Sequence, residues 1–63
     1  MGHWTIYGNF LANDGRIYGH IIDITDWEHK AVETAEKVLK EQRSCTSVYI
    51  TNEHGKSRFI TRN

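Results

Sequence analysis

The single cysteine of this chain limits how a protein of its size can be stabilised. Small domains commonly supplement a thin hydrophobic core with disulfides, a metal ion or a partner subunit. Cys45 is the only cysteine among 63 residues, so an intrachain disulfide is impossible. A chain of this length buries only about 60% of the surface that its unfolded form exposes. We therefore expect a marginal core, to which a second chain could contribute.

The composition indicates one globular domain over residues 1–63. Hydrophobic residues make up 38% of the chain and charged residues 25%, which is typical of folded domains. The formal net charge is zero, which disfavours a protein that binds nucleic acid mainly through phosphate contacts. No segment predicts a membrane span. The lone thiol and the lack of a secretory signal between Met1 and Phe10 lead us to expect a cytoplasmic protein.

Aromatic and β-branched residues predict a β-hairpin at the start of the chain. Residues 4–11 and 16–24 have the composition of strands, and Asn13-Asp14-Gly15 between them has that of a turn. A helix is predicted from about Asp26 to Arg43, where apolar residues recur every three or four positions. Thr25 and Glu28 fit a capping box at its start, with Asp26 as the alternative cap.

A second hairpin completes the predicted fold. Residues 45–52 and 57–62 have strand composition, and His54-Gly55 fits the tip of a tight turn. The element order is ββαββ. We therefore predict a single two-layer α+β domain, in which a four-stranded, mainly antiparallel sheet carries one helix packed on one face.

Strand alternation assigns the side chains to the two faces of this sheet. A three-residue loop at 13–15 would pair Phe10 with Tyr18 and Gly8 with His20 on the helix-covered face. It would also pair Ile6 with Ile22 and Trp4 with Ile24. A two-residue turn at His54-Gly55 would pair Ile50 with Phe59 and Val48 with Thr61.

The opposite face would then be unusually apolar for a sheet surface exposed to solvent. Its large predicted members are Tyr7, Leu11, Ile17, Ile21, Tyr49 and Ile60, among Thr5, Asn9, Asp23, Ser47, Thr51, Arg58 and Arg62. Two interpretations remain open. Either the register is shifted by one residue, which would exchange the faces, or this face binds a partner, most simply a second copy of the chain.

The remaining reactive side chains lack the spacing of a metal or catalytic site. The four histidines and Cys45 do not show the close pairs of a structural zinc site. We interpret Cys45, which follows the helix, as a buried structural residue. Asp26 and Glu28 are explained by helix capping, and no phosphate-binding loop or nucleophile motif is present. We therefore expect no metal, no cofactor and no enzymatic activity.

We predict a small protein-binding regulator, adaptor or inhibitor that acts through the exposed apolar sheet face, as a homodimer. The predicted contact residues are Tyr7, Leu11, Ile17, Ile21, Tyr49 and Ile60, with Arg58 and Arg62 at the rim. The alternative is binding of single-stranded RNA. In that case Tyr7 and Tyr49 would stack bases while Lys56, Arg58 and Arg62 contact phosphates.

Overall fold

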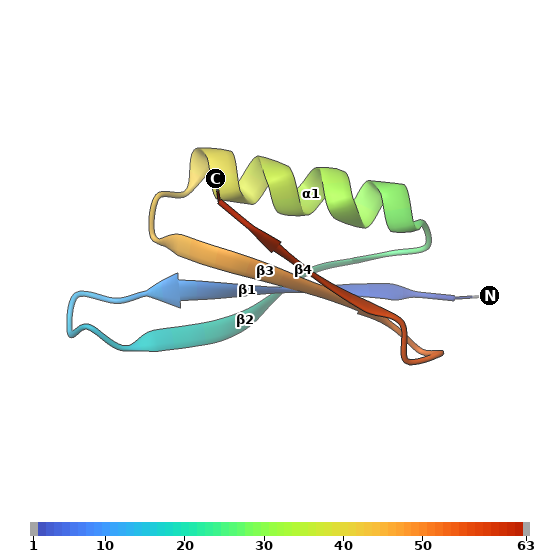
Figure 1. The fold of residues 1–63 in the computed structure, drawn as a ribbon, viewed down its shortest axis with the longest axis horizontal. Coiled ribbons are helices and arrows are strands. Elements are labelled where there is room, and N and C mark those ends of the chain that lie inside the picture. The colour runs from blue at the N-terminus through green and yellow to red at the C-terminus, as the bar shows by residue number, and fades with distance from the viewer. Residues whose placement is uncertain (1, 63) are drawn as a thin grey trace.

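A computed structural model, which describes residues 2–62, confirms the predicted ββαββ fold (Figure 1). The elements are β1 (Trp4–Leu11), β2 (Ile17–Thr25), α1 (Glu28–Glu41), β3 (Cys45–Asn52) and β4 (Ser57–Thr61). The four strands form one antiparallel sheet in the order β2-β1-β3-β4. Helix α1 packs on one face of the sheet and leaves the other without a covering element.

The first hairpin turns through the three-residue loop that the sequence predicts. The Ala12 amide donates to the Arg16 carbonyl at 2.8 Å, which closes the loop. Gly15 has a φ of 85°, a left-handed conformation that glycine adopts without steric cost. The Asp14 carboxylate accepts the Arg16 amide at 2.9 Å and the Tyr18 hydroxyl at 3.0 Å. Phe10 therefore pairs with Tyr18, as predicted.

The second hairpin also uses a three-residue loop, so the predicted two-residue turn is wrong. The Asn52 amide donates to the Lys56 carbonyl at 2.9 Å, and Gly55 adopts a φ of 84°. The Asn52 side-chain oxygen accepts the amides of His54 and Lys56, which fixes the loop.

One additional loop residue shifts β4 by one position against β3. Ile50 pairs with Arg58 and Val48 with Ile60, instead of the predicted Phe59 and Thr61. Because successive strand residues point to opposite faces, this shift places Ile60 on the helix side.

A register irregularity in β2 corrects the prediction for the far end of the first hairpin. Ile6 pairs with Asp23 and Tyr7 with Ile21, so Ile22 is an additional residue in β2. The predicted Ile6–Ile22 and Trp4–Ile24 pairs are therefore wrong. Such a bulge reverses the alternation beyond it. Ile24 pairs with Thr5 and lies on the side opposite the helix, whereas Asp23 lies on the helix side.

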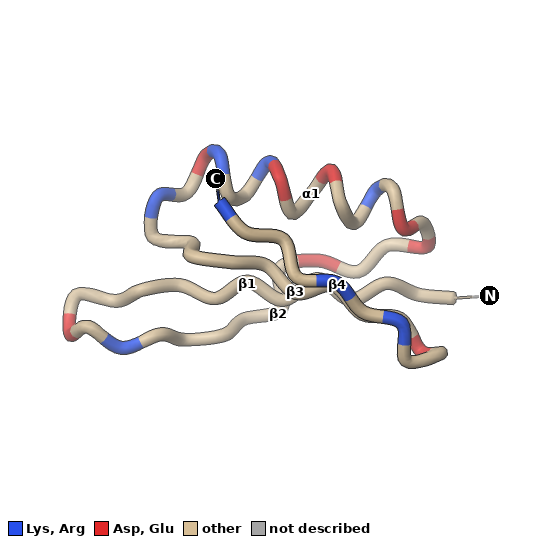
Figure 2. Tube along the Cα trace, viewed as in Figure 1, with Lys and Arg blue, Asp and Glu red and all other residues tan. Residues whose placement is uncertain are grey.

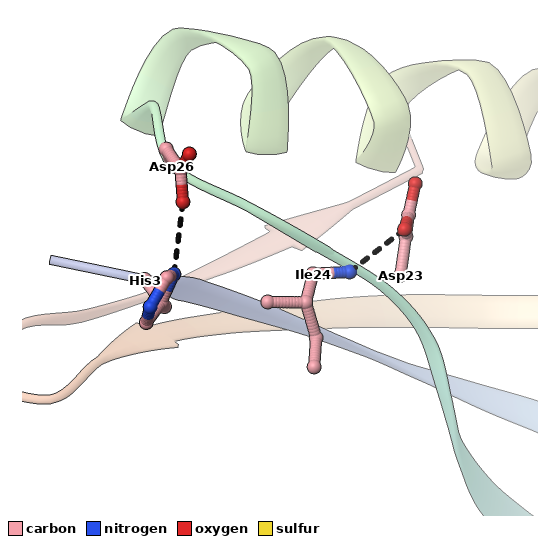
Figure 3. Close-up of polar contacts among 4 residues, drawn as sticks. All are labelled: His3, Asp23, Ile24 and Asp26. Atoms are coloured by element: carbon pink, nitrogen blue, oxygen red, sulfur yellow. Dashed lines mark hydrogen bonds and ion pairs between the residues drawn. The ribbon is translucent and has the colours of Figure 1, made fainter.

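The predicted capping box does not form at the start of α1. Thr25 is the last residue of β2, where it pairs with Trp4. The helix begins at Glu28 after an extended Trp27 whose side chain makes no capping hydrogen bond. The Asp26 carboxylate instead contacts His3 Nδ1 at 2.8 Å (Figure 3). The His3–Asp26 contact joins the segment before β1 to the β2–α1 connection.

The core lies between α1 and the two central strands, β1 and β3. Its buried members are Trp4, Ile6, Ala31, Ala35, Val38, Leu39, Cys45, Val48 and Ile50. Phe10, Ile22, Val32 and Ile60 pack around them. Four large core residues come from strands, and all of them lie on β1 or β3: Trp4, Ile6, Val48 and Ile50. The edge strands therefore contribute little to the core.

At Gly8, the ends of two partly buried side chains occupy the space that a Cβ would take. A Cβ at Gly8 would lie 2.5 Å from Ile22 Cδ1 and 2.7 Å from Phe10 Cε1. We expect Gly8→Ala to lower the free energy of unfolding by about 1–3 kcal/mol, since both side chains must move. Gly19→Ala is the matched control, because a Cβ there meets nothing closer than 3.4 Å. Urea denaturation of both variants tests this, and equal stabilities would contradict the packing argument.

Candidate binding surface

Strand pairing defines the surface opposite α1, which we call the open face. Tyr7 and Tyr49 lie at its centre, where they pair across β1 and β3. The complete set is Thr5, Tyr7, Asn9 and Leu11 of β1, Ile17, Gly19, Ile21 and Ile24 of β2, Ser47, Tyr49 and Thr51 of β3, and Ser57, Phe59 and Thr61 of β4. Most of its large side chains are exposed: Tyr7, Leu11, Ile17, Ile21, Ile24 and Phe59.

Five of the predicted contact residues lie together on this face: Tyr7, Leu11, Ile17, Ile21 and Tyr49. The other three do not. Ile60 packs against the core from the helix side. The Arg58 guanidinium lies 3.4 Å from the Glu28 carboxylate in the first turn of α1. Arg62 donates to the carbonyls of Gln42 and Cys45 beyond the end of α1. The predicted basic rim is therefore absent from the open face.

The open face has two large apolar residues that the sequence pattern did not predict there. Phe59, 68% exposed, takes the position predicted for Ile60, and Ile24, 56% exposed, takes that predicted for Asp23. The glycine in the third position of both loops, Gly15 and Gly55, is the sequence signal that could have revealed the β4 register. Correcting the register makes the open face more apolar than the sequence predicted.

Aromatic side chains form a row across three strands of the open face. The ring centroids of Tyr7 and Tyr49 are 6.2 Å apart, and those of Tyr49 and Phe59 are 4.8 Å apart. Tilted pairs at such distances are favourable contacts between aromatic rings. Beside the row, where Gly19 has no side chain, the face has a shallow depression lined by Tyr7, Asn9, Gly19, Tyr49, Thr51 and Phe59. The surface thus combines projecting rings with a hollow.

None of the residues that strand pairing places on the open face carries a charge. Figure 2 shows that Lys, Arg, Asp and Glu are concentrated on α1 and in the segments that connect the elements. One charged residue lies in β2 and one in β4, while β1 and β3 contain none. Asp23, in β2, lies on the helix side of the sheet, as does Arg58. The open face can therefore attract a ligand through apolar contact and hydrogen bonds, but has no ionic group of its own.

Cys45 is fully buried in the core, as predicted. Burial raises the pKa of the thiol above its ordinary value of 9.0, and Arg62 offsets this only in part. The folded protein then keeps the thiol proton at a pH where the unfolded chain has lost it. The stability that depends on this proton is complete below pH 9 and decreases as the pH rises above it.

We therefore expect the free energy of unfolding to decrease more steeply above pH 9 in the parent protein than in Cys45→Ala. Urea denaturation of both proteins at several pH values measures the two slopes. Comparison with Cys45→Ala removes the contribution of tyrosines and lysines, which titrate in the same range. Identical slopes would contradict the assigned effect of burial.

The remaining titratable groups are dispersed over the described part of the chain. Among residues 2–62, no three His, Cys, Asp or Glu side chains lie close enough together to hold a metal ion. A second shallow depression, lined by Glu28, His29, Val32, Glu33 and Arg58, lies beside the first turns of α1. Two of the charged residues that line this depression, Glu28 and Arg58, form an ion pair with each other.

Comparisons with known proteins do not add a relative: no family model, curated protein or solved structure matches this chain. Within residues 2–62, no helix has both the length and the apolar character needed to cross a bilayer. The interpretation of the open face thus depends on its own residues.

Proposed function

We propose that this protein is a non-enzymatic binding module that recognises protein through its open face. The observation that carries the proposal is the absence of charge from a face that exposes Tyr7, Leu11, Ile17, Ile21, Ile24 and Phe59. Monomeric proteins rarely expose contiguous apolar patches of more than a few hundred Å². Covering such a patch removes apolar surface from water, which stabilises a complex by about 25 cal/mol per Å².

The residue types on the open face also fit a protein contact. Aromatic residues are enriched at protein interfaces and charged residues are depleted from their centres. Tyr7 and Tyr49 offer hydroxyls beside their rings, so they can form hydrogen bonds at the edge of an apolar contact. We expect these tyrosines and Phe59 to provide the largest share of the binding free energy.

Binding of single-stranded RNA is the second candidate, favoured by the row of Tyr7, Tyr49 and Phe59. Aromatic rings on a sheet can stack bases at about 1–3 kcal/mol each. Phosphate contact needs cations, however, and Arg58 and Arg62 are engaged on the helix side. Lys56 lies in the loop between β3 and β4, at one end of the sheet. The absence of cations from the open face places this candidate second.

Affinity capture from the source cell tests the proposed function. Tagged parent protein, Ile21→Lys and Tyr18→Lys are compared, and the bound proteins and nucleic acids are both identified. Tyr18 is the matched control because it lies in the same strand on the helix side and is 44% exposed. We expect Ile21→Lys to lose the captured proteins and Tyr18→Lys to keep them. Capture of RNA that is released by salt and lost in Phe59→Ala would favour the second candidate and overturn the first.

A further inference from the structure

We propose that the occupant of the open face is a second copy of this chain, related by a twofold axis and packed sheet against sheet. This inference rests on the proposed function, since it names the partner of the same surface. The resulting dimer has four layers, with the two sheets inside and one helix on each outer side. Sheets packed in this way lie about 10 Å apart.

The absence of charge makes the open face complementary to itself. In a twofold interface the same patch contributes from both subunits, and residues near the axis meet their own copies. A lysine or aspartate there would face a like charge. The central residues of the open face, Tyr7, Asn9, Ser47 and Tyr49, are all uncharged. A heterologous partner is commonly selected and oriented by charged groups, and the open face supplies none.

The size of the open face fits a dimer contact. Strands of eight residues, as in β1 and β3, are about 26 Å long, and four strands spaced about 4.8 Å apart are about 19 Å wide. The projected area is thus roughly 500 Å², and projecting side chains such as Phe59 increase the accessible area beyond this value. A stable interface needs about 800 Å² from each partner. The contact must therefore cover nearly the whole open face, including its projecting side chains.

The edges of the sheet are less suited to association than its open face. β2 carries the bulge at Ile22, and the Asp23 carboxylate accepts the Ile24 amide at 2.8 Å (Figure 3). β4 has only five residues and is flanked by Lys56 and Arg62. Bulges, short strands and charged residues are the features that prevent pairing between sheet edges. A second copy is therefore expected to cover the open face rather than extend the sheet.

Alkylation of a cysteine on the open face tests this proposal. Ser47→Cys places a small reactive side chain near the centre of the face, and Lys37→Cys places one on the exposed side of α1. Cys45 is buried, so its own reaction with maleimide should add little to the rate of either variant. Only uncovered cysteines react with maleimide, so we expect the Ser47→Cys rate to decrease about tenfold when the protein concentration is raised from far below the dimer dissociation constant to about fifty times that constant. The Lys37→Cys rate should stay constant, and the mass should double over the same range.

Two outcomes overturn the proposal and differ in what they imply for the proposed function. If the mass doubles while Ser47→Cys stays reactive, the chain associates through another surface. If the mass stays that of one chain and Ser47→Cys reacts freely at every concentration, no second copy covers the face. In the latter case, protection of Ser47→Cys by a captured protein would still support protein binding, whereas its absence would remove both proposals.

Discussion

The Ile21→Lys variant is expected to be a folded monomer under conditions in which the parent protein is a dimer. Ile21 is 59% exposed on the open face and contributes nothing to the core cluster, so its replacement leaves the fold intact. In the dimer, each copy loses the burial of one isoleucine, at about 2 kcal/mol each. Two such losses weaken the dimer by about a thousandfold, before the cost of covering a lysine ammonium is added.

Size-exclusion chromatography with light scattering, at matched concentrations, measures this effect. Tyr18→Lys is the control, because it introduces the same charge on the opposite face of β2. Circular dichroism establishes that both variants remain folded. Equal association of the parent protein and Ile21→Lys would contradict the assignment of the open face as the contact surface.

The Ile50→Ala variant is expected to lose a large part of the stability of the domain. Ile50 is fully buried between the sheet and α1. Truncation of a buried isoleucine to alanine costs about 2–5 kcal/mol. A chain of this length has a total stability of only about 3–9 kcal/mol. We therefore expect a marginally folded protein at low concentration.

Urea denaturation of Ile50→Ala and Ile17→Ala measures the difference. Ile17 is 59% exposed on the open face, so its truncation should change the stability of the monomer by less than about 0.5 kcal/mol. Association should also stabilise the fold, because a partner that binds only the native state raises the apparent stability with concentration. An Ile50→Ala loss below about 1 kcal/mol would contradict the position of this residue in the core.

The sequence predicts the elements well because each has a strong local signal. The apolar period of α1 and the β-branched and aromatic composition of the strands identify the fold without tertiary information. The first loop was also predictable, since Asn13-Asp14-Gly15 places glycine where a left-handed residue is required.

The two errors in register arise from features whose local signal is weak. Glu53-His54-Gly55 forms the same kind of loop as Asn13-Asp14-Gly15, but His54-Gly55 was interpreted as a two-residue turn. The bulge at Ile22 has no sequence signal, because Ile21, Ile22 and Ile24 all suit a strand. Each one-residue shift exchanges the faces beyond it. The helix side therefore carries Ile60, Arg58 and Asp23, which were predicted on the open face. The open face carries Phe59 and Ile24 in their place.

The helix start was mispredicted for a tertiary reason. A capping box needs Thr25 outside any strand, but Thr25 pairs with Trp4 at the end of β2. Pairing between strands thus took precedence over a local capping motif. Asp26, the alternative cap, contacts His3, a residue 23 positions away in the sequence. Local sequence cannot reveal such a contact.

Sedimentation equilibrium of the parent protein over a range of concentrations tests whether the open face joins two copies of the chain. We expect a transition from 7.4 kDa, the mass of one chain, to twice that mass at micromolar concentrations. Ile21→Lys should stay at the lower mass throughout, while Tyr18→Lys should follow the parent protein. A parent protein that keeps the mass of a single chain at every concentration, with the open face uncovered, would contradict self-association through this face.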